Sequence, residues 1–462
     1  MELLTHKNKL IIFFAIVLTI LLFAIDFMII VPSLPNILED IGGLQYINWV
    51  FTAFMLAQTI ITPIYGKLSD IFSRKKMFLL AIVIFVVSSM AAGLSQNIYE
   101  LIIARAIQGI GGGALMVTSM SMIGEIFSIK ERAKYQGYIG GAFAFASVAG
   151  PIVGAVITDE FSWRWIFFIN FPIGLLAFAI LYLYLPKSLH QNKEAKIDYL
   201  GSGLLITTLF PMLLMFSFIS KANEISTTTI ILFIVSVVSF ILFYKTEKKV
   251  SSPIFSHHLF TDRYFMVPAI MTFINAIVMF AVMVYVQIYA QKILGFSLKE
   301  SGMIMSAIAI PIAFTSPICG QIIARTGKYK KVVIIGAAIL FLSVIGFLYG
   351  ILNGMTSNGL ILHIVPIGVG LGAMMSVFNI IVQMVYGRER LGEVMGAIQL
   401  ARGVGSSFGT AFIGFIFAIF VKDMNTDIVQ ISHAVVVIFC IMSLLCFISL
   451  ISAFFMKEKK IS

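Results

Sequence analysis

The sequence is poor in charged residues, cysteine and histidine. Of its 462 residues, 11% are charged, three are cysteines and six are histidines. Soluble domains carry about 25% charged residues, so this composition excludes an ordinary soluble protein. The cysteines Cys319, Cys440 and Cys446 stand in apolar stretches without the spacing of a metal site. We therefore expect no disulfide, no metal and no cofactor.

Hydrophobic residues make up 60% of the chain, and the mean hydropathy is +1.03. The net charge of +11 would also suit a nucleic-acid partner. However, the basic residues stand in short runs between apolar segments, as they do in the cytoplasmic loops of membrane proteins. The composition predicts an all-α polytopic membrane protein that lies in a lipid bilayer and binds no nucleic acid.

Fourteen apolar segments are long enough to cross a bilayer, which takes ~20 residues. If both termini are cytoplasmic, most Lys and Arg residues fall on the inner side, as the positive-inside rule expects for a multi-pass membrane protein. The basic residues left on the outer side are Arg164, Lys221, Lys292, Lys299 and Lys422. The predicted spans are residues 10–31, 46–66, 77–95, 99–123, 135–157, 165–185, 198–219, 227–244, 265–290, 301–324, 332–352, 360–385, 393–420 and 433–455.

The two halves of the chain repeat one another. The stretch GIGGGALM beginning at Gly109 recurs as GVGLGAMM at Gly368, and the same offset of 259 residues pairs Gly150 with Gly409. The repeat predicts two six-helix bundles in the same orientation, residues 1–186 and 264–462, with residues 187–263 inserting a two-helix hairpin. Parallel halves of this kind are typical of transporters.

One carboxylate, Asp26, interrupts the first apolar segment. A charge at membrane depth costs at least ~2.5–3.5 kcal/mol, so it needs a partner, water or a proton. At ~1.5 Å per residue, Asp26 and Arg105 lie at nearly the same depth in a ~30 Å core. Burial favours the protonated acid and a nearby Arg favours the carboxylate. We therefore predict that Asp26 and Arg105 form a proton-coupling pair; a static salt bridge is the alternative.

Several motifs resemble those of the major facilitator superfamily and, within it, the fourteen-span drug:proton antiporter branch of multidrug efflux transporters. They are Gly66–Lys76 between spans 2 and 3, Arg105–Gly109 in span 4, Ala146–Gly154 in span 5, Asp26 with Pro32–Pro35, and Trp163–Pro172. The resemblance covers nearly the whole chain.

The resemblance implies proton-coupled efflux of lipophilic cationic, zwitterionic or neutral compounds, such as quaternary ammonium compounds, dyes and quinolones. The expected partners are small-molecule drugs and protons, and the expected state is a monomer. One alternative is a dedicated exporter of one metabolite or lipid-like molecule. Another is a membrane sensor or scaffold that does not transport. An enzyme is not expected, because the sequence contains no metal, triad or acid-dyad constellation.

The resemblance also implies a gate on the cytoplasmic face. Asp70, in the loop that follows Gly66, is expected near Gly392-Glu393, and Glu125 is a plausible partner for Arg74. An ordinary charged loop is the alternative. In span 5, Gly150, Pro151 and Gly154 either seal the protein against leak or serve close helix packing.

A drug cavity should combine apolar walls with a few polar groups. Arg402 stands at depth in span 13 without an acid at matching depth. It either contacts substrate by attracting an anionic group, such as a quinolone carboxylate, or bonds backbone carbonyls and water. In the earlier part of the repeat the offset is 254 residues, as between Gly66 and Gly320, so the counterpart of Asp26 is Phe280, which does not favour dicationic substrates. The residues predicted to bind substrate are Asp26, Gln58, Gln108, Asn275, Tyr285, Gln287, Asn379, Gln383, Gln399 and Arg402.

Overall fold

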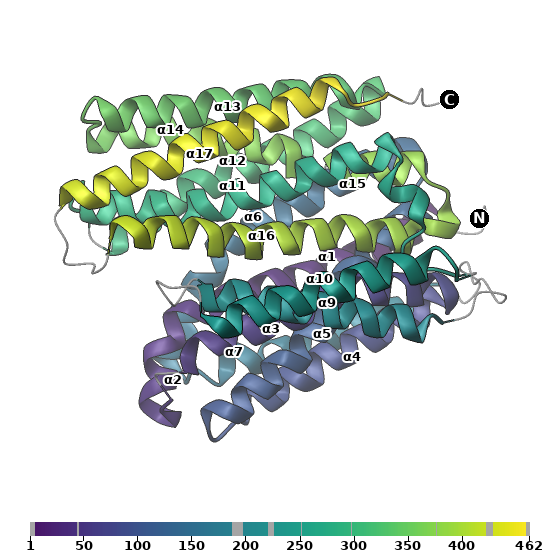
Figure 1. The fold of residues 1–462 in the computed structure, drawn as a ribbon. Helices are drawn as coiled ribbons and strands as arrows, with labels where there is room; N and C mark the ends of the chain where they lie inside the picture. The colour runs from purple at the N-terminus through teal and green to yellow at the C-terminus, as the bar shows by residue number, and fades with distance from the viewer. Residues whose placement is uncertain are drawn as a thin grey trace.

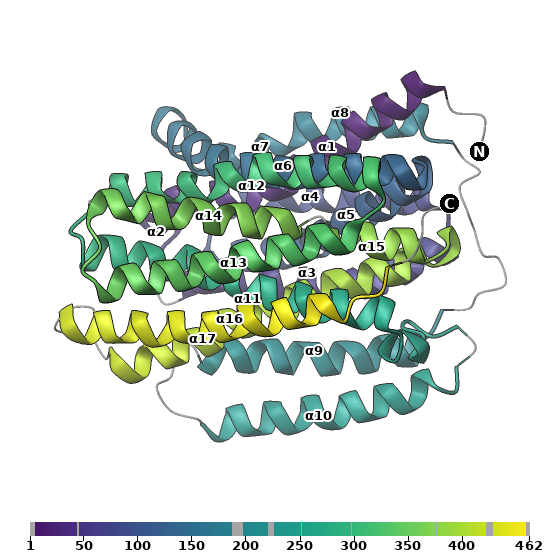
Figure 2. The same ribbon diagram turned by 90° about the horizontal axis from the view of Figure 1, so that it is seen from above.

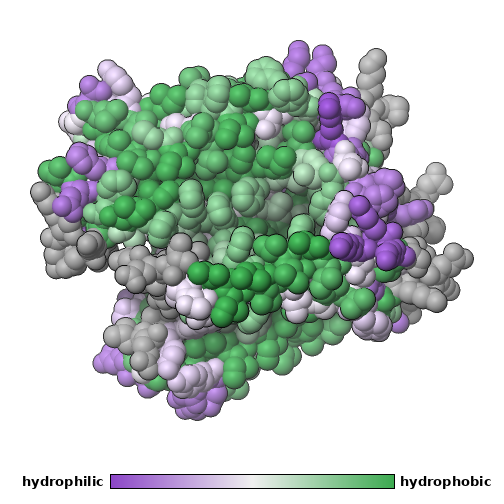
Figure 3. Space-filling model, viewed as in Figure 1, coloured by the Kyte–Doolittle hydropathy of each residue, from purple (hydrophilic) through white to green (hydrophobic). Residues whose placement is uncertain are grey.

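The computed structural model describes residues 5–43, 46–186, 197–219, 226–250, 252–296, 298–375, 377–421 and 428–458. Within these ranges it has fourteen helical spans that are long and apolar enough to cross a membrane, which confirms the count predicted from the sequence. An apolar band runs across the middle of the molecule between two hydrophilic ends (Figure 3). Both termini lie at the same end, which we call the termini side (Figure 1).

The described helices form two bundles and a hairpin, as predicted (Figures 1 and 2). The first bundle contains α1 (His6–Ile29), α3 (Ile47–Ile71), α4 (Arg74–Gly93), α5 (Ile98–Ile126), α6 (Ile129–Glu160), α7 (Trp165–Phe168) and α8 (Asn170–Tyr184). The hairpin is α9 (Tyr199–Ile219) and α10 (Thr227–Glu247). The second bundle contains α11 (Arg263–Lys292), α12 (Leu298–Thr326), α13 (Tyr329–Leu352), α14 (Ser357–Met375), α15 (Val377–Val385), α16 (Leu391–Phe420) and α17 (Ile428–Phe454).

The two bundles meet along two seams, where α3 packs against α16 and α6 against α12. The hairpin covers the first seam, because α9 contacts both α3 and α16, while α10 lies on its outer side (Figure 2). On this face Phe216 of α9 packs edge-on against Phe408 of α16, with ring centroids 5.3 Å apart. The domain limits at 186/187 and 263/264 stay a prediction.

The repeated glycines lie at equivalent helix crossings in the two bundles. A Cβ on Gly109 of α5 would collide with the carbonyl of Phe54 in α3. A Cβ on Gly368 of α14 would collide with the carbonyl of Ile308 in α12. Small residues let membrane helices approach this closely. The sequence repeat therefore reflects the same packing in both bundles.

The segment after the first span differs from a simple loop. It forms a 3₁₀ turn, Val31–Ser33, and the short helix α2 (Leu34–Ile41), with Pro35 in its first turn. Proline fits this position because the first helical N–H groups have no partner inside the helix. The carboxylate of Asp40 in α2 accepts hydrogen bonds from Trp163 Nε1 at 3.0 Å and from Arg164. This contact ties α2 to the loop that precedes α7.

Candidate functional site

Asp26 and Arg105 form the expected ion pair inside the first bundle. Asp26 Oδ2 accepts a hydrogen bond from Arg105 Nη1 at 2.5 Å, and both side chains have no solvent exposure. Breaking a buried pair by removing one partner leaves an uncompensated charge and costs several kcal/mol. The two residues, which are separated by 79 positions, are therefore energetically dependent on one another.

The other oxygen of Asp26 is also fully engaged. Oδ1 accepts hydrogen bonds from Gln108 Nε2 at 2.8 Å and from Asn170 Nδ2 at 2.7 Å. Asn170 also donates to Ser89 Oγ at 2.8 Å. All three groups that face Asp26 are N–H donors, and an ionised carboxylate only accepts hydrogen bonds. Each of these donors therefore faces a carboxylate oxygen that accepts its hydrogen bond.

Sequence reasoning did not assign a role to Asn170. The residue stands in the motif Trp163–Pro172, which was read only as a family resemblance, and it begins α8. Its contact with Asp26 spans 144 positions and depends on how α8 packs against α1. An amide in an otherwise apolar segment was the only available signal.

An aromatic cluster connects the ion pair to the centre of the molecule. The guanidinium carbon of Arg105 lies 4.2 Å from the ring centroid of Phe54. The ring of Phe54 in turn packs against Phe23 and Phe27 of α1, with centroids 6.1 Å apart in each case. A desolvated cation–π contact is worth up to about 2 kcal/mol. Phe54 therefore touches both the ion pair and the two α1 rings.

A cavity of about 180 Å³ lies between the two bundles. α1 contributes Phe23, Ala24, Phe27 and Met28 to its wall, whereas Asp26 is turned into the bundle and does not line the cavity. Ligand sites for drug-sized molecules measure roughly 300–1,000 Å³. The cavity is thus contracted in this conformation, and a larger occupant needs the walls to separate.

Four of the residues predicted to bind substrate line this cavity. They are Gln58, Asn275, Gln399 and Arg402. The wall around them is apolar and rich in sulfur and aromatic rings. It includes Met55, Met116, Met279, Met283, Met375, Phe143 and Phe280. Methionine side chains repack easily around ligands of different shape.

The other residues predicted to bind substrate lie elsewhere in this conformation. Besides Asp26, Gln108 belongs to the ion-pair network. Tyr285 is buried in the second bundle, where its ring packs against Phe417 at 5.3 Å between centroids. Gln287 is partly buried on α11 and does not belong to the cavity wall.

Asn379 and Gln383 lie in α15, at the contact between the bundles on the termini side. Asn379 Nδ2 lies 3.9 Å from Met120 Sδ, and Gln383 Nε2 donates to the carbonyl of Met120 at 2.8 Å. Arg132 of α6 donates to the carbonyl of Gln383. These side chains join the two bundles and do not belong to the cavity wall.

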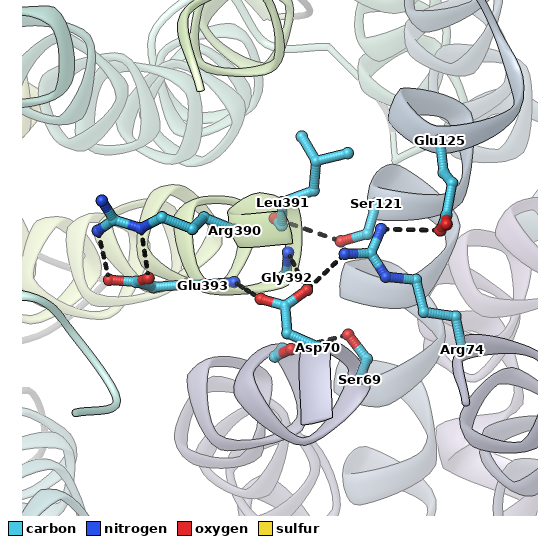
Figure 4. A network of polar contacts seen from close by, with 10 residues as sticks. Ser69, Asp70, Arg74, Ser121, Glu125, Arg390, Leu391, Gly392 and Glu393 are labelled. Carbon is cyan, nitrogen blue, oxygen red and sulfur yellow. Dashed lines mark hydrogen bonds and ion pairs between the residues drawn. The ribbon is translucent and has the colours of Figure 1, made fainter. Parts of the chain in front are cut away.

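A charged cluster closes the same side of the α3–α16 seam (Figure 4). Asp70 accepts hydrogen bonds from the backbone N–H groups of Gly392 at 2.9 Å and Glu393 at 2.8 Å, at the N-terminus of α16. Arg74 donates to Asp70 Oδ1 at 2.5 Å and to Glu125 Oε2 at 3.0 Å. A helix N-terminus favours an anion, so Asp70 fits this position. We call these five residues the latch.

The backbones also come very close beside the latch. A Cβ on Gly66 of α3 would collide with the carbonyl of Gly392, and a Cβ on Gly392 would collide with the carbonyl of Gly66. Glu393 additionally accepts a hydrogen bond at 2.7 Å from the N–H of Ser256, in the segment between the hairpin and α11. The termini side of the cavity is therefore closed by both backbone packing and hydrogen bonds.

Span 5 packs tightly against span 1 at the predicted glycines. A Cβ on Gly150 would meet Met28 Cβ at 2.7 Å, and one on Gly154 would collide with the carbonyl of Ile29. Pro151 lies inside α6, which runs from Ile129 to Glu160 without interruption. Close packing accounts for both glycines, and a gating role of this segment stays a prediction.

Comparison with known proteins agrees with this architecture. The sequence matches the family model described as Major Facilitator Superfamily over residues 16–410 and 268–461. It is 33% identical over 407 residues to the multidrug transporter protein MdtP of Bacillus subtilis (strain 168), which covers 87% of this chain and 74% of that protein. It is 34% identical over 344 residues to multidrug resistance protein 3 of the same organism, which covers 74% of this chain and 66% of that protein.

Solved structures share the fold at low sequence identity. The human organic anion transporter MFSD10 superposes with a TM-score of 0.71 at 18% identity, over 96% of this chain and 99% of that one. The proton:xylose symporter XylE superposes with a TM-score of 0.70 at 15% identity, over 99% of this chain and 98% of that one. The fold is thus that of a multi-pass membrane transporter built from two bundles. The chain belongs to the major facilitator superfamily.

Proposed function

We propose that this transporter is a proton-coupled multidrug antiporter that exports lipophilic small molecules by alternating access. The observation that carries the proposal is the position of α1, which presents Phe23 and Phe27 to the cavity and Asp26 to the buried ion pair. One helix thereby contacts both the substrate space and an ionisable group. An ionisable residue inside a membrane span is typical of proton relays.

The proposed cycle depends on competition between a proton and Arg105 for Asp26. A proton on Asp26 removes the charge that holds Arg105, so α1 and α5 become free to shift. A substrate that presses on Phe23 or Phe27 displaces Phe54, which touches the guanidinium at 4.2 Å. Substrate and proton therefore favour different arrangements of the same helix, which is the requirement for exchange.

In this proposal, the closed latch indicates which side of the transporter is closed. We place both termini in the cytoplasm of a bacterial cell, because this orientation brings most basic residues to the inner side. The closed termini side is then the cytoplasmic side, and the protein is in an outward-facing or occluded state. Opening inward requires Asp70 to leave the N-terminus of α16. The protein acts as a monomer, since each chain contains both bundles and the cavity between them.

The two Bacillus relatives are named for multidrug transport and multidrug resistance, which supports drugs as the substrates. Export is the direction in which a transporter would give resistance. The substrates would be cationic, zwitterionic or neutral lipophilic compounds such as quaternary ammonium compounds, dyes and quinolones. The apolar, methionine-rich wall supports broad rather than narrow selectivity.

The decisive experiment is substrate-induced proton movement in liposomes that contain the wild type or Asp26→Asn. When a substrate gradient is imposed, the wild type should move protons in the direction opposite to the substrate. Asp26→Asn should bind substrate and move no protons. Asp40→Asn is the matched control, because Asp40 lies in α2 outside the spans, and it should keep coupling. Proton-driven export that survives in Asp26→Asn would refute the mechanism.

The alternatives are separated by two further measurements. Resistance to a single compound on expression, rather than to many, would favour a dedicated exporter of one metabolite or lipid-like molecule. Ligand binding by the wild type without any proton movement would favour a sensor or scaffold.

A further inference from the structure

Within the described residues, one formal charge lines the cavity, and it is positive. Arg402 of α16 contributes to the wall, whereas Asp26 of α1 faces away from the cavity and pairs with Arg105. The acids of the second half between residues 264 and 421 are Glu300, Glu389 and Glu393, all near helix ends. The cavity therefore has no carboxylate with which to attract a cation.

The guanidinium of Arg402 is only partly satisfied. In the part of the chain that the structure describes, it makes one hydrogen bond, from Nη2 to the carbonyl of Met375 at 3.1 Å, and no ion pair. An Arg side chain carries five N–H donors. Met375 ends α14, so this bond uses the negative end of that helix and leaves the other donors available to the cavity.

An isolated cation at membrane depth is costly, and it is normally compensated by an acid, by water or by a ligand. Arg is also the side chain best suited to bind a carboxylate or phosphate through two parallel hydrogen bonds. The rest of the wall, including Phe280, Met279 and Phe143, is apolar. The site thus matches a molecule with a large hydrophobic body and one anionic group.

We propose that Arg402 binds an acidic group of the substrate, so that the transporter prefers lipophilic monoanions and zwitterions over permanent monocations. This inference rests on the proposed function for the direction and energy of transport. It adds monoanions to the proposed substrates and places permanent cations below them in preference. The carboxylate, or a similar anionic group, faces Arg402, and the hydrophobic body lies among the Phe and Met side chains.

The test compares three fluorescent probes with the same aromatic body: pyrenebutyrate, its methyl ester and pyrenebutyl-trimethylammonium. Binding to purified wild-type protein is measured by fluorescence anisotropy at neutral pH. We expect the wild type to bind the carboxylate at least about tenfold more tightly than the trimethylammonium probe, because a hydrogen bond to a charged group contributes about 1.5–3 kcal/mol. If the wild type bound both probes with equal affinity, or bound the trimethylammonium probe more tightly, this measurement alone would overturn the proposal.

Variants of Arg402 test whether this side chain causes the preference for the carboxylate probe. Arg402→Gln should weaken carboxylate binding about tenfold to hundredfold and change ester binding less than about threefold. Arg402→Lys keeps the charge and should retain part of the preference. Arg325→Gln removes the same charge from an exposed position of α12 and should change nothing. Unchanged carboxylate binding in Arg402→Gln would overturn the proposal.

The two proposals fail in different ways. If pyrenebutyrate binds through Arg402 but its export moves no protons, the coupling mechanism is wrong and the binding site stands. If the trimethylammonium probe is exported in exchange for protons more efficiently than pyrenebutyrate, the coupling mechanism stands and the anion preference is wrong.

Discussion

The two bundles share a repeat but treat charge in opposite ways. In the first bundle Asp26, Arg105 and Gln108 form a closed and fully buried network. At the repeat-related positions the second bundle has Phe280, Ile364 and Ile367, of which both isoleucines are fully buried and Phe280 lines the cavity. Conversely, the unpaired Arg402 corresponds to Phe143 in the first bundle, and both line the cavity.

This contrast indicates that the two bundles have different functions within one fold. The same helix crossings are kept by glycines in both bundles, so the packing does not require the charges. A paired charge that is sealed from the cavity suits a proton switch, whereas an unpaired charge that faces the cavity suits ligand recognition. The predictions below test that division, starting from the largest expected effect.

The paired arginine should matter far more for stability than the unpaired one. Arg105→Gln leaves the carboxylate of Asp26 buried and uncompensated, which costs about 3–5 kcal/mol. Arg402→Gln leaves no acid without a partner and removes an uncompensated cation, so it should cost no more than about 1 kcal/mol, the size of a typical net hydrogen bond. Thermal unfolding in the same detergent measures both. The double variant Asp26→Asn, Arg105→Gln should recover most of the loss, and failure to recover would argue against strong coupling within the pair.

The membrane potential should act differently on the three probe charges. With one proton exchanged per substrate, a monocation moves no net charge, a neutral compound moves one charge and a monoanion moves two. Each charge is worth ~2.3 kcal/mol per 100 mV, so the monoanion gains about twice as much as the ester. Uptake into liposomes at fixed pH gradient and varied potassium potential measures this order. The same potential dependence for acid and ester would contradict the scheme.

The latch should control access from the termini side. Asp70→Asn keeps one acceptor oxygen but turns an NH2 donor toward one of the two backbone N–H groups, that of Gly392 or that of Glu393, and it removes the charge that pairs with Arg74. We expect transport to fall at least about tenfold, equivalent to ~1.4 kcal/mol. Ser406 lines the cavity. Ser406→Cys, in a background without the native cysteines, should react faster with a thiol reagent added from the termini side when Asp70→Asn is also present.

The control for the latch is Glu389→Gln, which changes an exposed acid at the same end of the molecule. It should leave both transport and labelling rates as in the wild type. If Asp70→Asn behaves like this control, the cluster is an ordinary charged loop rather than a latch.

Phe54 should influence coupling more than affinity. Phe54→Leu keeps an apolar side chain but removes the ring that contacts Arg105 and the two α1 phenylalanines. We expect several-fold less proton movement per substrate, with substrate affinity changed less than about threefold, because a desolvated cation–π contact is worth up to about 2 kcal/mol. Phe78→Leu, a buried phenylalanine of α4, is the packing control. Equal coupling in both variants would exclude the proposed role.

The smallest effect concerns Asp40, which lies outside the spans. Hydrogen bonds from Arg164 and then Trp163 lower the pKa of Asp40 below its ordinary value of 3.8. An acid whose pKa is lowered by folding stabilises the protein above its ordinary pKa, and this contribution is lost as the pH falls through both values. Asp40→Asn should therefore slightly flatten the acid limb of the unfolding-temperature profile. An unchanged profile would show that this exposed contact contributes no stability.

Much of the fold and of the ion pair followed from the sequence. Fourteen apolar segments predicted fourteen spans because each must satisfy its own backbone hydrogen bonds in lipid. The depths of Asp26 and Arg105 predicted their contact, because two charges in lipid are far less costly together than apart. The family resemblance implied that Asp70 lies near Gly392 and Glu393, and both of their N–H groups bond to it. Glu125 was named as a partner for Arg74, and the two form an ion pair.

The lining of the cavity was decided by tertiary structure alone. Gln58 and Gln399 face the cavity, while Gln383 turns to the seam and Asn170 reaches Asp26 from a distant segment. In a soluble helix the polar face marks the surface, but membrane helices are apolar on all sides, so the sequence does not show which face meets lipid, a neighbouring helix or a cavity. Only the packing of helices that are far apart in the chain decides which side chains face the cavity. That packing places Arg402 in the cavity wall and keeps Asp26 out of it.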